Sequence, residues 1–254
     1  MNKTMRFYKI TKLFGLIEVI ICSVRKFFSF YLPKIFRSMN EEYSNLFGMS
    51  LKQWFLYQHR NIIFDKCYWM GVRAMKNPLD AWIYQEIIYE VKPDIIIEIG
   101  SAEGGSTLYF ANLLDLLGKG IVISIDIDRT KYHIEHGRIT IITGNSSSPD
   151  IISKVSNLCN GKCVLVVHDG DHRKESVLKD LRPYSTLVSV NSYFIVEDGV
   201  ADLFQAGDGI GMFEEGPLKA IEEFLVENHN FIVDKERERY ILTYNPKGFL
   251  KRIR

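Results

Sequence analysis

The chain has 254 residues, of which 46% are hydrophobic and 25% are charged, and these proportions are typical of a globular protein and exclude a chain that is disordered throughout. The formal net charge of +1 gives no electrostatic argument for nucleic-acid binding, and we expect no nucleic-acid partner. Four cysteines are too few for a disulfide framework in a chain of this length, so we expect reduced thiols in a cytoplasmic protein.

Residues 1–40 form a basic arm. They carry eight Lys and Arg residues against one acidic residue, a net charge of +7, whereas the rest of the chain carries −6. From Leu13 to Tyr31 apolar side chains recur on one face of a predicted helix, which Pro33 ends. Such a helix can lie on an anionic membrane surface, or it can pack against the body or a second subunit. The basic amphipathic pattern of residues 1–37 therefore predicts either peripheral contact with a membrane or assembly into a homo-oligomer.

Residues 41–77 are polar and aromatic without clear periodicity. We interpret them as a linker and a helical cap that contains a short helix over residues 51–58. A regular pattern begins at Pro78, where a proline at the first position of a helix follows Asn77. We therefore expect one α/β domain over residues 78–254.

Helices and apolar strands alternate through this domain. Helices are predicted over residues 78–90, 105–117, 149–158, 174–187 and 217–228, and strands over residues 94–100, 121–126, 139–143, 163–168, 193–196, 231–234 and 239–244. This alternation, closed by a hairpin, predicts a mostly parallel seven-stranded Rossmann-like sheet. Helices should cover both faces, and an antiparallel strand should lie near one edge.

Ligands of such sheets bind beyond the carboxyl ends of the strands. After the first predicted strand come Gly100 and Gly104, which permit a tight turn and close approach of a ligand. The spacing is G-x-x-x-G-G, and the central glycine of the dinucleotide pattern G-x-G-x-x-G is replaced by Ala102. This difference counts against a pyrophosphate site, although tight packing alone also uses glycines.

The next two strand ends complete a predicted nucleoside pocket. The second strand ends at Asp126, followed by Asp128, and a carboxylate at this point can accept both ribose hydroxyls. The third strand is followed by Asn145 and Ser146, polar groups suited to the edge of adenine. A pocket without a phosphate clamp fits S-adenosylmethionine better than NAD. The alternative for Asp126 is a solvated acid in a turn.

Acidic residues gather after the fourth and fifth strands. The sequence there places Asp169, Asp171 and His172 after one strand, and Glu197 and Asp198 after the next. Carboxylates this close repel unless a cation lies among them, and an oxygen-rich set favours Mg²⁺. The first of the two Asp residues is at the strand end, whereas the second could instead cap the following helix. The histidine is either a surface side chain or a general base.

Several linked motifs between residues 68 and 250 resemble the cephalosporin hydroxylase-like family of class I methyltransferase-fold proteins, which includes rhamnosyl O-methyltransferases. The motifs are Tyr68-Trp69-Met70-Gly71, Lys76-Asn77-Pro78-Leu79-Asp80, Tyr84-Gln85-Glu86, the run from Lys92 to Gly100, Gly104-Gly105-Ser106, Asp126-Ile127-Asp128, Asp169-Gly170-Asp171-His172 and Val196-Glu197-Asp198. Ser101 keeps a hydroxyl where the family usually has Gly-Thr.

The resemblance implies an enzyme that uses S-adenosylmethionine and Mg²⁺. The cofactor ligands that it implies are Glu98, Gly100, Gly104, Gly105, Ser106 and Asp126. It also implies that Glu197 and Asp198 bind the metal together with either Asp169 or Asp171, and that His172 is the base.

These observations predict a Mg²⁺-assisted O-methyltransferase that acts on a sugar, a glycan or a similar diol. The loop over residues 201–216, rich in glycine, is long enough to form a lid over this acceptor. The first rival is an NAD-dependent oxidoreductase or hydroxylase-type enzyme of the same fold. The second is a non-enzymatic scaffold at the membrane periphery, which would have no need of converging carboxylates.

Overall fold

The computed structural model divides the chain into two compact units, residues 1–53 and 54–254. The described residues are 44, 46–204, 208 and 215–254. The predicted arm over residues 1–40 lies outside them, and so does most of the predicted lid loop over residues 201–216.

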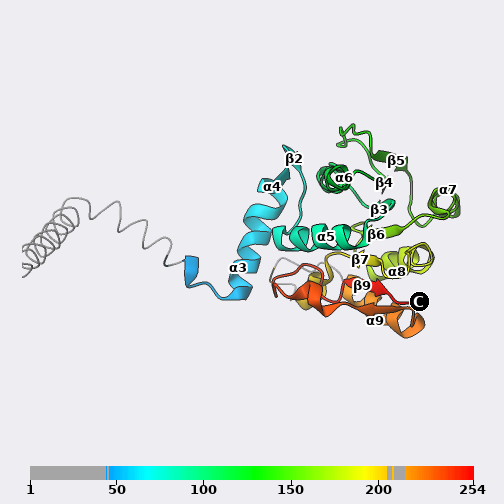
Figure 1. The fold of residues 1–254 in the computed structure, drawn as a ribbon. Coiled ribbons are helices and arrows are strands. Elements are labelled where there is room, and N and C mark those ends of the chain that lie inside the picture. Colours follow the sequence, from blue (N-terminus) through cyan, green and yellow to red (C-terminus); the bar gives the residue numbers. More distant parts are fainter. Residues whose placement is uncertain (1–43, 45, 205–207, 209–214) are drawn as a thin grey trace, which may run out of the picture. The chain divides into compact units, whose positions relative to one another are not determined.

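A seven-stranded sheet lies at the centre of the second unit, within the described residues (Figure 1). Its strands are β3 (Ile95–Ile99), β4 (Ile121–Asp126), β5 (Ile139–Thr143), β6 (Val164–His168), β7 (Tyr193–Val196), β8 (Phe231–Val233) and β9 (Phe249–Arg252). They are ordered β5-β4-β3-β6-β7-β9-β8, and β9 runs antiparallel to both of its neighbours. The predicted fold, a mostly parallel sheet with an antiparallel strand near one edge, is confirmed.

The helices follow the predicted segments closely. They are α3 (Leu51–Gln58), a π-helical turn η1 (His59–Ile63), α4 (Phe64–Lys66), α5 (Pro78–Val91), α6 (Gly105–Leu117), α7 (Pro149–Cys159), α8 (Lys174–Tyr184), the 3-10 helices η2 (Gly199–Leu203) and η4 (Lys235–Glu238), and α9 (Pro217–Glu227). A short hairpin of β1 (Tyr68–Trp69) and β2 (Val72–Arg73) precedes α5. The Asn77 side chain caps α5 by accepting a hydrogen bond from the Leu79 N–H.

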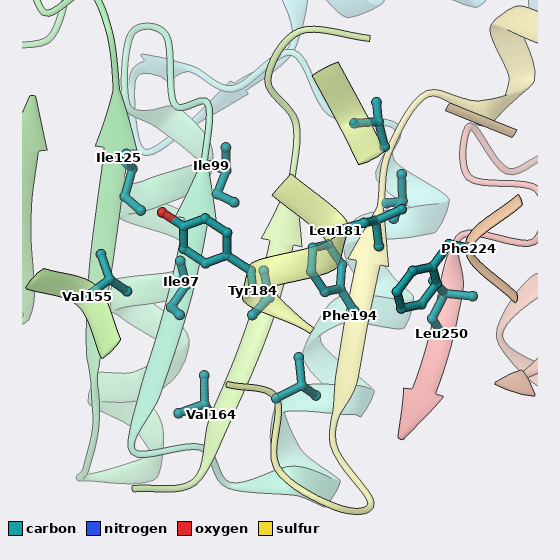
Figure 2. Packing of buried hydrophobic residues seen from close by; sticks show 14 of the residues in the cluster. Ile97, Ile99, Ile125, Val155, Val164, Leu181, Tyr184, Phe194, Phe224 and Leu250 are labelled. Atoms are coloured by element: carbon teal, nitrogen blue, oxygen red, sulfur yellow. The ribbon is translucent and has the colours of Figure 1, made fainter. Parts of the chain in front are cut away.

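Side chains alternate between the two faces of the sheet and form two buried clusters. On β3, Ile97 and Ile99 point toward α7, α8 and α9, whereas Ile96 points toward α5 and α6. Figure 2 shows the first face, where the Tyr184 ring of α8 lies among Ile97, Ile99 and Ile125. Because both faces are covered, the sheet residues read as continuous apolar runs, and only the strand ends are free to carry chemistry.

The last predicted strand is wrong. The sequence pattern placed it at residues 239–244, but the strand next to β8 is β9, and residues 239–248 form a connection instead. Polar side chains of this connection are held by α5, since the Arg239 guanidinium pairs with Glu86 at 2.6 Å and the Thr243 hydroxyl donates to Asp80 at 2.5 Å. Phe249 and Leu250 of β9 fill the core in place of the residues of the predicted strand.

The described part of the chain holds neither a disulfide nor a helix long and apolar enough to cross a membrane. Cys67, Cys159 and Cys163 are free thiols there.

Candidate active site

The carboxyl ends of the five parallel strands lie side by side at one end of the sheet. The pairing register aligns Ile99 of β3 with Ile125 of β4 and with His168 of β6, which in turn aligns with Val196 of β7. The residues that follow these positions therefore emerge side by side. Every predicted strand-end cluster lies at this end of the sheet.

The glycine loop after β3 is held against the loop after β6. Gly100 has a φ of +83°, and a Cβ there would overlap the backbone carbonyl of Asp169. Gly104 has a φ of +90°, and a Cβ there would lie 2.6 Å from the Tyr132 ring. Both positions need glycine for the backbone conformation and for the close approach. The glycines thus bring the predicted cofactor loop next to the predicted metal ligands.

Asp126 fastens this loop to β4. Its Oδ2 accepts hydrogen bonds from the N–H groups of Ser101 at 2.8 Å and Ala102 at 2.9 Å, and its Oδ1 accepts one from the Asp128 N–H at 3.0 Å. Burial alone would raise the pKa of Asp126, but these donors outweigh it and hold the pKa below its usual range. Oδ1 keeps acceptor capacity for one further hydroxyl.

Two cavities open beside Asp126. The larger, about 420 Å³, is also lined by the loop after β5, including Asn145 and Ser146. The smaller, about 270 Å³, is lined by Ser101, Ser106 and Asp169. Both are lined by Gly100, Asp126, Ile127, Gly170 and Asp171. An extended ligand that follows the loop can therefore reach from the β5 end to the Asp169 carboxylate.

The predicted polar groups after β5 line the larger cavity while making internal bonds. The Asn145 Oδ1 accepts hydrogen bonds from the Ser147 N–H and hydroxyl, at 3.1 and 2.9 Å. The Ser146 hydroxyl donates to Asp180 at 2.9 Å, and the same carboxylate lies 3.1 Å from His168 Nε2. These bonds leave the Asn145 amide N–H₂ as the donor on this wall.

Four predicted cofactor residues, Glu98, Gly104, Gly105 and Asp128, line neither cavity. Glu98 is fully buried, and its carboxylate accepts hydrogen bonds from the hydroxyls of Ser106 and Thr107 at the start of α6. Gly105 packs against the backbone of residues 73 and 74, and the exposed Asp128 carboxylate binds Thr130. Their predicted contact with the cofactor therefore stays a prediction. Glu98 instead anchors the helix that carries the loop.

The acidic strand ends converge beside the smaller cavity. One ligand atom from each of Asp169, His172 and Asp198 can be chosen so that all lie within 4.8 Å of one another. His172 Nε2 is 3.3 Å from the Asp198 carboxylate and 3.8 Å from that of Asp169. Asp198 has a φ of +60°, a conformation that non-glycine residues rarely adopt and that is concentrated at functional sites.

Glu197 lies next to this group but is paired with a lysine. Its Oε2 accepts a hydrogen bond from the Lys76 ammonium at 2.7 Å, while its Oε1 is buried without a partner. The same ammonium contacts Asp169. Burial lowers the pKa of Lys76, but the two carboxylates outweigh burial and raise it above its ordinary value. Lys76 therefore stays charged, and it is a site residue that sequence analysis left without a role.

The acidic charges act on one another. Burial, followed by the nearby Asp169 carboxylate, raises the pKa of Glu197 well above its usual range. Burial also raises the pKa of Asp198; the neighbouring His172 opposes this shift and Asp169 adds to it. In both groups burial is the largest cause of the raised pKa, and the like charge of Asp169 adds to it.

Asp171 lies apart from the cluster. Its carboxylate accepts hydrogen bonds from the Arg173 N–H at 3.1 Å and the Ser176 hydroxyl at 2.9 Å, and it forms an ion pair with the Arg173 side chain. Asp171 does not cap α8, whose N-cap is Arg173 without a side-chain cap, but its hydrogen bonds stabilise the turn that leads into the helix. Of the two Asp residues, Asp169 is the one that joins Asp198.

A second residue without a predicted role is Arg129. Its guanidinium donates to the Ser101 hydroxyl at 2.6 Å, the Ser124 carbonyl at 2.7 Å and the Ile142 carbonyl at 3.2 Å. It thereby ties the glycine loop to β4 and β5. An arginine three residues after the strand-end acid was the only signal in the sequence, and it did not reveal that the side chain turns back under the loop.

The residues present fit a hard divalent cation. Asp169 and Asp198 offer oxygen ligands, and the buried, unpartnered Oε1 of Glu197 lies beside them. Oxygen donors of this kind are those that Mg²⁺ prefers. The fit rests on this donor set and on the unpartnered Oε1 of Glu197.

Comparison with known proteins places the chain in a family. The sequence model of the Rhamnosyl O-methyltransferase/CmcI family matches residues 61–253. Rhamnosyl O-methyltransferase of Mycobacterium leprae is 30% identical over 241 residues, which covers 90% of this chain and 98% of that protein. The Mycobacterium tuberculosis protein of the same name is 32% identical over 76% of this chain and 80% of its own length.

Solved structures agree with the fold. The Mg-SAM form of CmcI superposes with a TM-score of 0.59 and 21% identity, covering 75% of this chain and 78% of that one. Together with the sequence match over residues 61–253, the relatives show that the chain belongs to the Rhamnosyl O-methyltransferase/CmcI family of O-methyltransferases.

Proposed function

We propose that the protein transfers a methyl group from S-adenosylmethionine to a sugar hydroxyl with the help of Mg²⁺. One observation carries the proposal: Asp126 of the cofactor loop and Asp169 of the acidic group line the same cavity of about 270 Å³. A methyl donor held by the first residue and an acceptor hydroxyl held near the second would meet there. The names of the relatives and the Mg-SAM form of CmcI support the same chemistry.

The cofactor would lie along the two cavities. The free acceptor capacity of Asp126 Oδ1 suits a ribose hydroxyl, and Gly100 lets the backbone approach it closely. Asn145 and Ser146 line the far wall, where the adenine would lie. No G-x-G-x-x-G loop is present in the sequence, which weighs against the rival NAD-dependent enzyme.

Asp169 and Asp198 would hold Mg²⁺, with Glu197 beside them. When bound there, Mg²⁺ supplies positive charge that lowers the pKa of a coordinated hydroxyl and orients two neighbouring oxygens of the acceptor. Such an arrangement favours a vicinal diol, and sugars and glycans carry this group. Because carboxylate oxygens satisfy Mg²⁺, the imidazole of His172 is left for another task.

His172 would take the proton of the acceptor hydroxyl. Its Nε2 lies between the carboxylates of Asp169 and Asp198, at 3.8 and 3.3 Å, so that an imidazolium formed there is stabilised by both. The acceptor oxygen would then attack the methyl carbon, so that an O–C bond forms as the C–S bond breaks and S-adenosylhomocysteine leaves.

Methyl transfer from labelled S-adenosylmethionine to a panel of sugars tests the proposal. We expect transfer to sugars with vicinal hydroxyls, its loss in EDTA and its return with Mg²⁺. Asp169→Asn should raise the Mg²⁺ concentration needed for half-maximal rate, whereas Asp171→Asn should not change that requirement. Full activity in excess chelator, or transfer that ignores deletion of the neighbouring hydroxyl, would contradict the proposal.

A further inference from the structure

The Lys76 side chain is a buried cation inside the acidic site. Only 8% of it is exposed, and its ammonium pairs with Glu197 at 2.7 Å and with Asp169. An isolated ammonium is rarely buried, because removing it from water costs several kcal/mol unless carboxylates surround it. Lys76 therefore depends on the same carboxylates on which a metal ion would depend.

The charges of the site indicate how the two cations share it. When all three are ionised, Asp169, Glu197 and Asp198 carry three negative charges, and Lys76 carries one positive charge. A divalent ion would neutralise the remaining two. A monovalent ion would leave the group charged, whereas a divalent ion without the lysine would leave one carboxylate unpaired.

We propose that the Lys76 ammonium is a built-in counter-ion that holds the acidic site together without metal and weakens the binding of the divalent ion to it. This inference rests on the proposed metal site. Lys76 is a positioning residue here: it satisfies Glu197 and one oxygen of Asp169, and it sets the affinity of the remaining ligands for the metal.

The surrounding backbone keeps Lys76 at this point. Met75, the preceding residue, has a φ of +51°, and Asn77, the following one, caps α5. The Asn77 amide also donates to Asp80 at 2.9 Å and to the Leu242 carbonyl at 2.8 Å. This rigid attachment directs the lysine into the site.

The same polar network reaches the metal ligands from the other side. Asp80 accepts a hydrogen bond from the Tyr244 N–H at 2.8 Å, and the next residue, Asn245, accepts one from the Asp198 N–H at 3.1 Å. One buried network thus positions Lys76 and Asp198 together. The counter-ion and the ligand are therefore parts of one preorganised unit.

Removal of the lysine charge should have two opposite effects. In Lys76→Met the affinity for MgCl₂ or MnCl₂ alone, measured by titration calorimetry, should increase about tenfold or more, because a repelling charge a few ångströms away is gone. The melting temperature in EDTA should fall by about 10 °C, because Glu197 is left buried without a cation. Saturating Mg²⁺ should restore most of this loss.

Three further variants serve as controls for this test. Lys76→Arg retains the charge and should keep the affinity and melting temperature near those of the wild type. Lys119→Met is the matched control, because it removes a lysine that pairs with Asp94 at 2.8 Å at the opposite edge of the sheet; it should change neither quantity. The double variant Lys76→Met with Glu197→Gln should melt higher in EDTA than Lys76→Met alone.

The outcomes separate the two proposals. Metal binding by the wild type that is unchanged or weaker in Lys76→Met would overturn the counter-ion inference and leave the metal site standing. Absence of metal binding in both proteins would overturn the metal site and, with it, this inference. If Lys76→Met does not fold, the double variant with Glu197→Gln decides. Failure of the double variant to fold would contradict the role of Lys76 as the partner of Glu197.

Discussion

Replacing Gly100 with alanine should damage both halves of the site at once. Gly100 follows β3 and has a φ of +83°, and a Cβ added there would overlap the carbonyl of Asp169 and lie 2.8 Å from the Gly170 Cα. These neighbours are backbone atoms, so no side-chain rotation can relieve the overlap. The loop after β6 must move away, and it carries the carboxylate of Asp169.

The expected cost follows from two contributions. An alanine at positive φ costs about 1–2 kcal/mol relative to glycine. Backbone overlap of this kind adds about 2–3 kcal/mol, as does overpacking in a rigid core. We therefore expect Gly100→Ala to lower the free energy of unfolding by about 3–5 kcal/mol, and to lower the melting temperature by about 10 °C for a unit of this size.

Chemical denaturation and thermal melting measure this loss, and calorimetry with Mg²⁺ measures the displacement of Asp169. Gly118→Ala is the matched control, because Gly118 ends α6 at a φ of +72° with no atom within 4 Å of an added Cβ. It should lose only about 1–2 kcal/mol and keep full metal affinity. Equal losses in the two variants, or unchanged Mg²⁺ affinity in Gly100→Ala, would refute the argument that close contact holds the two loops together.

Three further predictions concern the cofactor, the buried acid and the arm. Asp126→Asn should weaken binding of S-adenosylhomocysteine about tenfold in calorimetry, since a bond to a charged acceptor is lost; Asp128→Asn, whose carboxylate binds Thr130, should change it less than about twofold. Burial raises the pKa of Glu98 from 4.5 to about 7, so its stabilising contribution is complete below about pH 4.5 and is lost as the pH rises through 7. Glu98→Gln should therefore flatten the pH dependence of unfolding by up to about 3 kcal/mol, and parallel curves would contradict this. Deletion of residues 1–40 should abolish flotation on anionic vesicles at low salt, and a change of oligomeric state instead would favour the subunit-contact alternative.

Most of the fold could be predicted because its sheet is buried on both faces. Residues 121–126 and 193–196 form largely buried strands with the predicted limits, and the partly exposed edge strand at residues 139–143 also has its predicted limits. The helix predicted over residues 174–187 ends at Tyr184 instead, because the N–H groups of Thr186 and Leu187 bond to carbonyls three residues back and form turns. The error at residues 239–244 has a tertiary cause: ion pairs and hydrogen bonds to α5 outweigh a local strand pattern.

The candidate site was predictable to the extent that strand register determines it. Parallel strands bring their carboxyl ends to one edge, so Asp126, Asp169 and Asp198 could be expected to converge from topology alone. The role of Glu98 could not, because its two hydrogen bonds depend on the rotamers of Ser106 and Thr107 eight and nine residues away. A strand-end acid that points outward and one that points into the core have the same sequence signature.

Charge partners explain which of the converging carboxylates remain available to a metal. Asp171 forms an ion pair with Arg173, two residues along the chain, and Glu197 forms one with Lys76, which is 121 residues away. The first partner follows from local turn geometry, whereas the second comes from an irregular segment before α5 and has no periodic signal. Asp169 shares the Lys76 ammonium through its Oδ2, so its Oδ1 and the Asp198 carboxylate are the oxygens that face each other across His172. The ligand set is therefore selected by the cations of the chain as much as by its acids, and a lysine remote in sequence decides how strongly that set attracts a metal.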